Sequence, residues 1–210
     1  MSTLKQFSMR LRKALPAPLR QVLRAGRLAT QPGKASPRIP QELLAECRFF
    51  ASRFEMLKGL PAGGTIAEIG TDKGLFASHI LKTNAPSRLH LFDLDFATLN
   101  PAVRRDPRVT LHEGATPGTL AALPEAGMDW IYVDGDHSYA GVVADAAAAA
   151  AKIRPGGYLV FNDFAHADPF LGQYGVHRAV MEFVSAQRWP IVMFAYHPSA
   201  LYDVAVRRPQ

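Results

Sequence analysis

The sequence predicts an α/β protein with a mostly parallel sheet, helices on both faces and an antiparallel pair of strands near the C-terminus. Three observations lead to this prediction. Short apolar runs alternate with helical patterns along most of the chain, which is typical of a parallel sheet with crossover helices on both faces. Several of these runs end in acidic residues or asparagine. The last two runs are joined by a short turn, which favours an antiparallel edge.

The length and composition fit one globular domain with an appended segment. The chain has 210 residues, of which 48% are hydrophobic and 20% charged, enough for one sizeable core. The single Cys47 excludes an internal disulfide framework and a cysteine-rich zinc site, which suits a reducing cytoplasm. No uncharged apolar run reaches the roughly 18 residues of a membrane-spanning helix. We therefore expect a cytoplasmic protein.

The basic charge of the chain lies at its N-terminus. Residues 1–41 contain nine Lys or Arg and no acid, whereas residues 42–210 contain 15 basic and 18 acidic residues. We predict a basic N-terminal arm over 1–41 and a folded domain over 42–210. Several roles remain open for the arm: a transit peptide, a peripheral membrane contact, a nucleic-acid contact, or packing on the domain or on a second copy in a homodimer.

The secondary-structure elements are expected in a regular order from residue 40 onward. The apolar spacing of residues 40–60 predicts a helix ending near Gly59. A short strand within 63–74 then runs into a glycine turn, and "LFASHILKT" predicts a helix over 75–83. The later strands are expected within 88–95, 108–115, 129–136, 156–163, 190–198 and 201–208, and the later helices within 139–153 and 175–187.

The glycine turn and the strand after it indicate an adenosine-containing ligand. Gly70 and Gly74 follow a strand and open a helix, so the backbone can approach a ligand at the helix amino end. Asp72 replaces the middle glycine of the dinucleotide fingerprint. Glu68 would lie unfavourably close to a pyrophosphate, and a positively charged ligand suits it better. Asp93 ends the next strand, where a carboxylate accepts hydrogen bonds from ribose hydroxyls.

Polar residues also follow the fourth and fifth predicted strands. Asp134, Asp136 and His137 follow the fourth, and Asn162 and Asp163 end the fifth. Neighbouring strands lie about 5 Å apart, so these side chains can meet in space. Two carboxylates and an amide suit Mg²⁺ or another hard cation, so we predict a metal held by Asp134, Asn162 and Asp163. The alternative is that the acids cap loops and face solvent.

Several of these segments together resemble a known enzyme family. The segments "EIGTDKG", "FDLD", "HEGA", "VDGDHSYAGVVAD", "IRPGGYLVFNDF" and "GVHRAVMEF" resemble the class I S-adenosylmethionine-dependent methyltransferases. The resemblance is closest to the macrocin and cephalosporin-pathway group of small-molecule O-methyltransferases, and it covers about residues 42–207. It implies a Rossmann-like, seven-stranded, mostly parallel sheet with helices on both faces and an antiparallel C-terminal hairpin.

The resemblance also implies roles for individual residues. Related catechol-type enzymes hold a metal with an Asp that ends the fourth strand and an Asp-Asn pair that ends the fifth, which here correspond to Asp134 and the reversed pair Asn162-Asp163. Those enzymes carry a lysine base where this chain has His137, and a neutral imidazole can also take a hydroxyl proton. The residues expected to border S-adenosylmethionine are Glu68, Gly70, Thr71, Gly74, Asp93, Gly114, Ala115 and Asp134.

We therefore predict a methyltransferase that uses S-adenosylmethionine and a divalent cation to methylate a hydroxyl of a sugar or other small natural product. His137 and Asp134 are the predicted catalytic residues. The loop 164–177 is expected to form either a lid or acceptor wall or an ordinary connection.

Three rivals remain beside this prediction. In a nucleic-acid methyltransferase the basic arm would bind the substrate, but the fourth strand ends in "DGDH" and not in the Asn- or Asp-Pro-Pro-aromatic turn of base methyltransferases. A catalytically silent cofactor-binding or scaffold protein is favoured by Phe76, which stands where many relatives have serine, and by the reversed Asn-Asp pair. A nicotinamide dehydrogenase lacks its fingerprint glycines.

Overall fold

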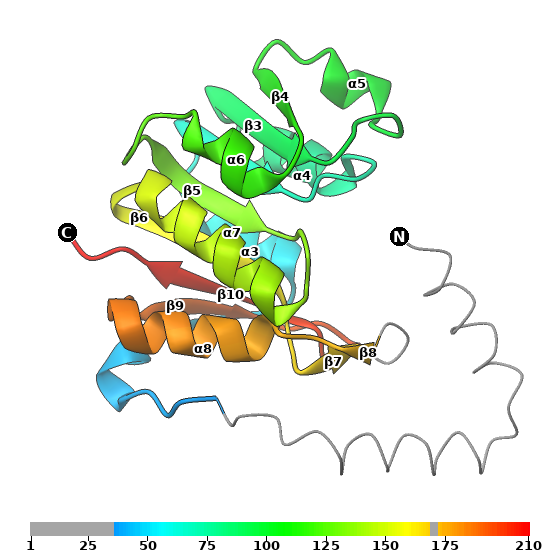
Figure 1. The fold of residues 1–210 in the computed structure, drawn as a ribbon. Coiled ribbons are helices and arrows are strands. Elements are labelled where there is room, and N and C mark those ends of the chain that lie inside the picture. The colour runs from blue at the N-terminus through cyan, green and yellow to red at the C-terminus, as the bar shows by residue number, and fades with distance from the viewer. Residues whose placement is uncertain (1–35, 169–171) are drawn as a thin grey trace, which may run out of the picture. The chain divides into compact units, whose positions relative to one another are not determined.

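The computed structural model describes residues 36–168 and 172–210 (Figure 1). Most of the predicted basic arm, residues 1–35, lies outside the described residues, so its proposed roles stay predictions. The last residues of that arm contact the domain. Ser36 Oγ lies 2.7 Å from His177 Nδ1, and Ile39 packs against the hydrophobic core.

The structure confirms the predicted α/β fold with a mostly parallel sheet. Its main sheet has the strand order β1-β9-β10-β6-β5-β2-β3-β4. Neighbours from β6 to β4 are parallel, whereas β10 is antiparallel to both β6 and β9, which forms the predicted C-terminal hairpin. The strands are β1 (Arg48–Phe50), β2 (Thr65–Ile69), β3 (Arg88–Asp93), β4 (Val109–Glu113), β5 (Met128–Val133), β6 (Ile153–Phe164), β9 (Ile191–Ala195) and β10 (Tyr202–Arg207). A separate two-stranded sheet pairs β7 (Ala167–Asp168) with β8 (Gly172–Gln173).

The helices cover both faces of the sheet, as predicted (Figure 1). The predicted helix over 75–83 has those bounds, and the two later ones differ from prediction by one residue. The helices are α3 (Arg53–Gly59), α4 (Leu75–Thr83), α5 (Pro101–Arg104), α6 (Thr116–Ala121), α7 (Tyr139–Lys152) and α8 (Val176–Gln187), with a short 3-10 helix η1 (Gln41–Leu43). Within the described part of the chain, none is long and apolar enough to cross a bilayer.

The prediction of one helix over residues 40–60 is wrong. The segment instead forms η1, the strand β1 and the helix α3, which begins after Ser52 caps its first turn by accepting a hydrogen bond from Glu55 N at 3.3 Å. Strand β1 pairs in parallel with β9 and satisfies backbone groups that would otherwise be open at the edge of the sheet. The main sheet of the described residues therefore has eight strands, one more than the resemblance implied.

Alternation along the strands divides the apolar side chains between two cores. On β5, Ile131 and Val133 face the core beneath α7 and α8, whereas Trp130 and Tyr132 face the core beneath α3 and α4. Successive strand residues point to opposite faces, so a strand covered on both sides is apolar at nearly every position. This double burial explains the continuous apolar run "WIYV" in the sequence.

We predict that β1 contributes to stability through one of its two phenylalanines. The Phe50 ring packs against Gly59 on α3 and joins the core beneath that helix, whereas Phe49 is 69% exposed. Phe50→Ala should lower the free energy of unfolding by about 1–3 kcal/mol, because it removes a partly buried ring. The matched Phe49→Ala should cost less than about 1 kcal/mol. Urea unfolding would measure both, and equal losses would contradict this placement of β1.

Candidate active site

The glycine turn after β2 is packed directly onto the end of β5. Gly70 has a φ of +83°, and a Cβ added there would overlap the backbone carbonyl oxygen of Asp134. The two strand ends are also joined by a hydrogen bond from Asp134 N to Ile69 O at 2.8 Å. Glycine is required at this position because any side chain would meet backbone that cannot move aside. The turn and Asp134 therefore form one continuous surface.

Two buried polar atoms beside this turn have no hydrogen-bond partner among the described residues. They are Glu68 Oε2 and Thr71 Oγ1. Glu68 is only 1% exposed, and burial, together with the nearby Asp134, raises the pKa of its carboxyl group well above the usual value, although the neighbouring Thr71 hydroxyl, which forms no ordinary hydrogen bond with it, opposes the shift. An unpaired buried polar group is costly. The arrangement therefore fits a ligand that brings hydrogen-bond donors or positive charge to Glu68, such as the ammonium group of S-adenosylmethionine.

Asp93 supports the other side of the turn. Its carboxylate accepts hydrogen bonds from the backbone of Asp72 and of Leu94, both at 2.7 Å. The carbonyl oxygen of Asp93 accepts a bond from Gly114 N at 2.9 Å, which joins the ends of β3 and β4. Leu94, next to Asp93, is 74% exposed. The residues predicted to border the cofactor are thus gathered at the carboxyl ends of β2, β3, β4 and β5.

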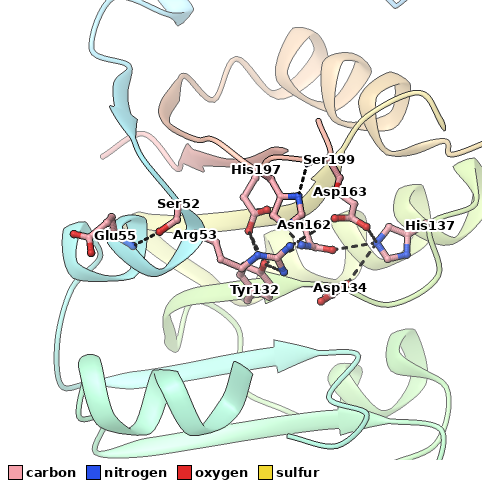
Figure 2. Close-up of polar contacts among 11 residues, drawn as sticks. Ser52, Arg53, Glu55, Tyr132, Asp134, His137, Asn162, Asp163, His197 and Ser199 are labelled. Atoms are coloured by element: carbon pink, nitrogen blue, oxygen red, sulfur yellow. Dashed lines mark hydrogen bonds and ion pairs between the residues drawn. The ribbon is translucent and has the colours of Figure 1, made fainter. Parts of the chain in front are cut away.

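The polar residues predicted at the ends of β5 and β6 do meet in space (Figure 2). The Nε2 atom of His137 lies 3.4 Å from Asp134 Oδ1 and 3.6 Å from Asp163 Oδ2. The imidazole ring stacks on Tyr174 with the ring centroids 4.7 Å apart. Asp163 has a φ of +51°, a conformation that is rare for residues other than glycine and that is found disproportionately at functional sites.

Sequence reasoning missed three further members of this cluster. Arg53, the first residue of α3, donates from Nη1 to the Tyr132 hydroxyl at 3.3 Å. That hydroxyl in turn donates to Asp203 Oδ2 at 2.5 Å. Arg53 Nη2 lies 3.8 Å from Asp163 Oδ1, and its Nε lies 3.8 Å from Asp203 Oδ2. Figure 2 shows the Arg53 side chain directed into the group formed by Tyr132, Asn162 and Asp163.

Only one of these three residues gave a signal in the sequence. Asp203 is an acid within the apolar run "LYDVAV" of β10 and is 1% exposed, and a buried carboxylate needs a partner. Arg53 lies in a segment whose pattern predicted one long helix. Tyr132 reads as an ordinary member of a buried strand.

The donor set does not fit the predicted Mg²⁺ site. The amide of Asn162 can be placed in two orientations, which only hydrogen bonding distinguishes. The orientation that satisfies its neighbours directs Nδ2 to Asp134 Oδ1 at 2.8 Å and to Asp163 Oδ1 at 3.1 Å, while Oδ1 accepts from Arg53 Nη1 at 2.8 Å. An N–H group then faces the two carboxylates that would bind the metal. Among the described residues, no three His, Cys, Asp or Glu side chains are arranged to hold a metal ion.

Burial shapes the ionisation of the acidic residues. Burial, reinforced by Asp163, raises the pKa of the Asp134 carboxyl group well above its usual value. Burial raises the pKa of Asp203 to about 6, although Arg53 opposes the shift. The Tyr132 hydroxyl has a pKa raised well above its usual value because it is buried beside Asp203 and Asp134. The cluster therefore holds protons more tightly than exposed carboxylates do.

Other polar and aromatic residues pack within the sheet or beside its helices. His90 is buried, and its Nδ1 lies 2.8 Å from Nε2 of His112. Phe76, on the first turn of α4, packs against Tyr132 with ring centroids 4.2 Å apart. The loop 164–177 includes residues 169–171, which lie outside the described residues, so its role as a lid stays a prediction.

The sheet order, the glycine turn and the terminal hairpin define the class I S-adenosylmethionine-dependent methyltransferase fold. Residues 67–164 match the family model described as a methyltransferase domain. This match covers slightly less than half of the chain and agrees with the predicted enzyme class, a methyltransferase. A search of curated protein sequences gave no match.

Solved structures agree with this fold. The N-methyltransferase NodS from Bradyrhizobium japonicum, solved with S-adenosylhomocysteine, is 17% identical, with a TM-score of 0.56 over 75% of this chain and 86% of NodS. A protein from Corynebacterium glutamicum is 16% identical, with a TM-score of 0.55 over 90% of this chain and 97% of that one. The pyocyanin biosynthetic protein PhzM is 16% identical, with a TM-score of 0.57 over 75% of this chain but only 54% of PhzM. At sequence identities this low, the similarity shows a shared fold and nothing more.

We predict that Asp203 makes the stability of the protein depend on pH. Because the pKa of its carboxyl group rises from 3.8 to about 6 on folding, the native state holds an extra proton between these values. The resulting stabilisation is fully present below about pH 4 and is lost as the pH rises through 6. Asp203→Asn should therefore gain stability relative to the wild type over this range, by about 3 kcal/mol at pH 7.

Thermal unfolding of both proteins between pH 4 and pH 7 would measure this difference. Asp106→Asn is the matched control: Arg108 lowers the pKa of Asp106, so its contribution changes only below about pH 4 and the difference from the wild type should stay nearly constant between pH 4 and pH 7. A constant difference between Asp203→Asn and the wild type across this range would contradict the prediction.

Proposed function

We propose that the protein transfers the methyl group of S-adenosylmethionine to a hydroxyl group of a small molecule. The observation that carries the proposal is the close packing of Gly70 on Asp134. It places the turn that suits the cofactor next to a cluster that can accept a proton. A hydroxyl is a weak nucleophile until it loses its proton, so O-methylation needs these two features side by side.

The residues around the turn suit S-adenosylmethionine, which supplies an electrophilic methyl group on a sulfonium. Glu68 and Thr71 would take the ammonium end of the methionine part, because both present buried oxygens without partners. Asp93 would accept hydrogen bonds from the ribose hydroxyls. Gly114 and Ala115, at the end of β4 and the start of α6, would lie along the adenine.

His137 is the proposed proton acceptor, and Asp134 assists it. Its Nε2 atom can take the hydroxyl proton when Nδ1 carries the ring hydrogen. The imidazolium that forms would be stabilised by Asp134 and Asp163, whose oxygens lie 3.4 and 3.6 Å from Nε2. Asp134 would therefore face the positive charge that forms on the imidazolium ring.

An aromatic surface beside the cluster supports an acceptor with an apolar part. Phe54, next to Arg53, is 44% exposed, and its ring packs against Phe76 at 6.2 Å and His79 at 4.5 Å. Phe76 continues this surface inward to Tyr132. A small natural product that carries a ring beside its hydroxyl, or a sugar with an apolar aglycone, would suit this combination. We propose on the resemblance of the sequence motifs alone that the protein belongs to the macrocin-type group.

The rival functions lack a comparable observation. A nucleic-acid methyltransferase would depend on the basic arm, most of which lies outside the described residues. A silent scaffold protein would need no proton acceptor beside the cofactor turn. Contact of the arm with a membrane or with a second copy, and a cytoplasmic location, stay predictions from the sequence.

The first experiment is a calorimetric titration of S-adenosylhomocysteine into the purified protein, followed by transfer of a labelled methyl group to a panel of small hydroxyl compounds. Binding followed by transfer would support the proposal. Binding without transfer to a broad panel would favour the silent rival. Absence of binding would contradict the proposal.

We predict opposite effects of Glu68→Gln on stability and on cofactor binding. The substitution removes a buried carboxyl group whose charge is disfavoured by burial and by Asp134, so the melting temperature should rise or stay unchanged. The same substitution removes the partner of the ligand's ammonium group, so the affinity for S-adenosylhomocysteine should fall by about 10- to 100-fold. The exposed Glu125→Gln is the matched control and should change neither. Unaltered affinity in Glu68→Gln would contradict the assigned role.

We predict that His137→Gln removes catalysis and leaves cofactor binding intact. Glutamine keeps hydrogen-bonding groups at this place but cannot take a proton, so kcat should fall by about 10²- to 10⁴-fold. The affinity for S-adenosylhomocysteine should change by less than about threefold, which is a small free-energy difference. His112→Gln, a histidine distant from the cluster, is the control. A kcat close to the wild-type value would show that another group accepts the proton.

A further inference from the structure

We propose that Arg53 takes the place of a divalent cation in this site: its guanidinium group neutralises the acidic cluster and holds Asn162 and Asp163 in position. Arg53 is thus a positioning residue that allows the cluster to work without a metal. This inference rests on the proposed function for its catalytic meaning, but its test is metal binding, which is measured independently of methyl transfer.

The contacts of Arg53 include the groups that were expected to bind the metal. Its Nη2 lies 3.8 Å from Asp163 Oδ1. In the satisfied orientation of the amide, Asn162 Oδ1 accepts from both Nη1, at 2.8 Å, and Nη2, at 3.1 Å. The guanidinium group therefore draws on the same oxygen atoms that a hard cation would need. Arginine stays charged at every accessible pH and offers five N–H donors in a fixed plane.

Charge balance favours the same assignment. Asp134, Asp163 and Asp203 gather at one place in the sheet. Arg53 is a permanent cation among them: its Nη2 and Nε atoms lie 3.8 Å from the carboxylate oxygens of Asp163 and Asp203. A divalent ion added to the same place would meet a positive charge already there, and repulsion between like charges at short range is strong in a partly buried site.

The residues that complete this arrangement lie outside the segment that matches the methyltransferase model. Arg53 precedes residue 67, and Asp203 follows residue 164. Arg53 reaches the cluster because α3 begins at the carboxyl edge of the sheet, on the face toward which Tyr132 points. Asp203 reaches it from β10, which pairs with β6 beside Asn162. The matched segment thus holds the expected metal ligands, and its flanks supply the arginine and a further acid.

The test is a calorimetric titration of Mn²⁺ into the full chain. The wild type should show no saturable binding. Arg53→Met keeps much of the length of the side chain but removes the charge. Its affinity for Mn²⁺ should therefore be at least about tenfold higher than the highest affinity that the wild-type titration would leave undetected. The double variant Arg53→Met/Asp163→Asn should lose that binding. Arg53→Lys, which keeps the charge, should behave like the wild type.

Arg154→Met is the matched control. Arg154 also pairs with an aspartate, Asp129, at 2.7 Å, but it is not part of the cluster, so its loss should create no site for Mn²⁺. Saturable binding by the wild type that is lost in Asp163→Asn would overturn the proposal. A folded Arg53→Met that binds no Mn²⁺ would also overturn it. Should Arg53→Met fail to fold, the wild type and Asp163→Asn alone decide the question.

Failure of this inference can be told from failure of the proposed function. A wild type that binds Mn²⁺ and still transfers methyl groups would contradict the role given to Arg53 but not the proposed function. A wild type that binds neither Mn²⁺ nor S-adenosylhomocysteine would sink the proposed function and leave the assignment of Arg53 standing as a structural role.

Discussion

The arrangement of this site depends on the need to balance negative charge at one buried edge of the sheet. Asp134, Asp163 and Asp203 converge there from β5, β6 and β10, in surroundings that disfavour charged carboxylates. Three carboxylates cannot all ionise so close together without a cation or shared protons. Arg53 supplies the permanent charge, and His137 lies where it can supply a second. The position of α3, which carries Arg53, is thus an electrostatic requirement of the site as well as a matter of packing.

The register of the parallel strands turns this requirement into a working geometry. Ile69 pairs with Val133, and Val133 pairs with Phe161, so the residues that follow these three positions emerge side by side. A slip of one residue would move each side chain to the other face of the sheet. Gly70 allows the cofactor turn to close against Asp134 in this register. The same backbone contact therefore sets the distance between the turn and the polar cluster around His137.

The sequence was a good guide to those parts of the fold that depend on local pattern. Strands covered on both faces produce continuous apolar runs, and their carboxyl ends meet at one edge, which is why the convergence of Asp134, Asn162 and Asp163 could be predicted. Strand β1 could not be, because its three residues lie within a helical pattern and its pairing with β9 joins segments more than 140 positions apart. Arg53 was missed for the same reason, since nothing nearby in the chain shows which acids its helix will meet.

The predicted metal shows a different limit of sequence reasoning. Acidic and amide side chains at neighbouring strand ends indicate that a cation is needed, but they do not specify whether it is an ion or a side chain. That choice is made by a residue about 80 positions before Asp134 and by the orientation of one amide group. An oxygen-rich cluster at strand ends therefore predicts that a positive charge lies nearby. It predicts a metal site only when no arginine or lysine of the fold lies close enough to supply that charge.

Local instability at the site follows from its proposed chemistry. Glu68 keeps a buried oxygen unpaired, Asp163 adopts a rare backbone conformation, and Asp134 is buried among other acids. Each feature costs folding free energy, and each is relieved or used when a positively charged ligand or a proton arrives. A ligand that satisfies Glu68 stabilises the native state by more than its contacts alone would suggest, because it also removes an existing penalty. In the proposed function the cofactor would complete the folded domain, and Gly70, which packs against Asp134, would link its binding to the proposed proton acceptor.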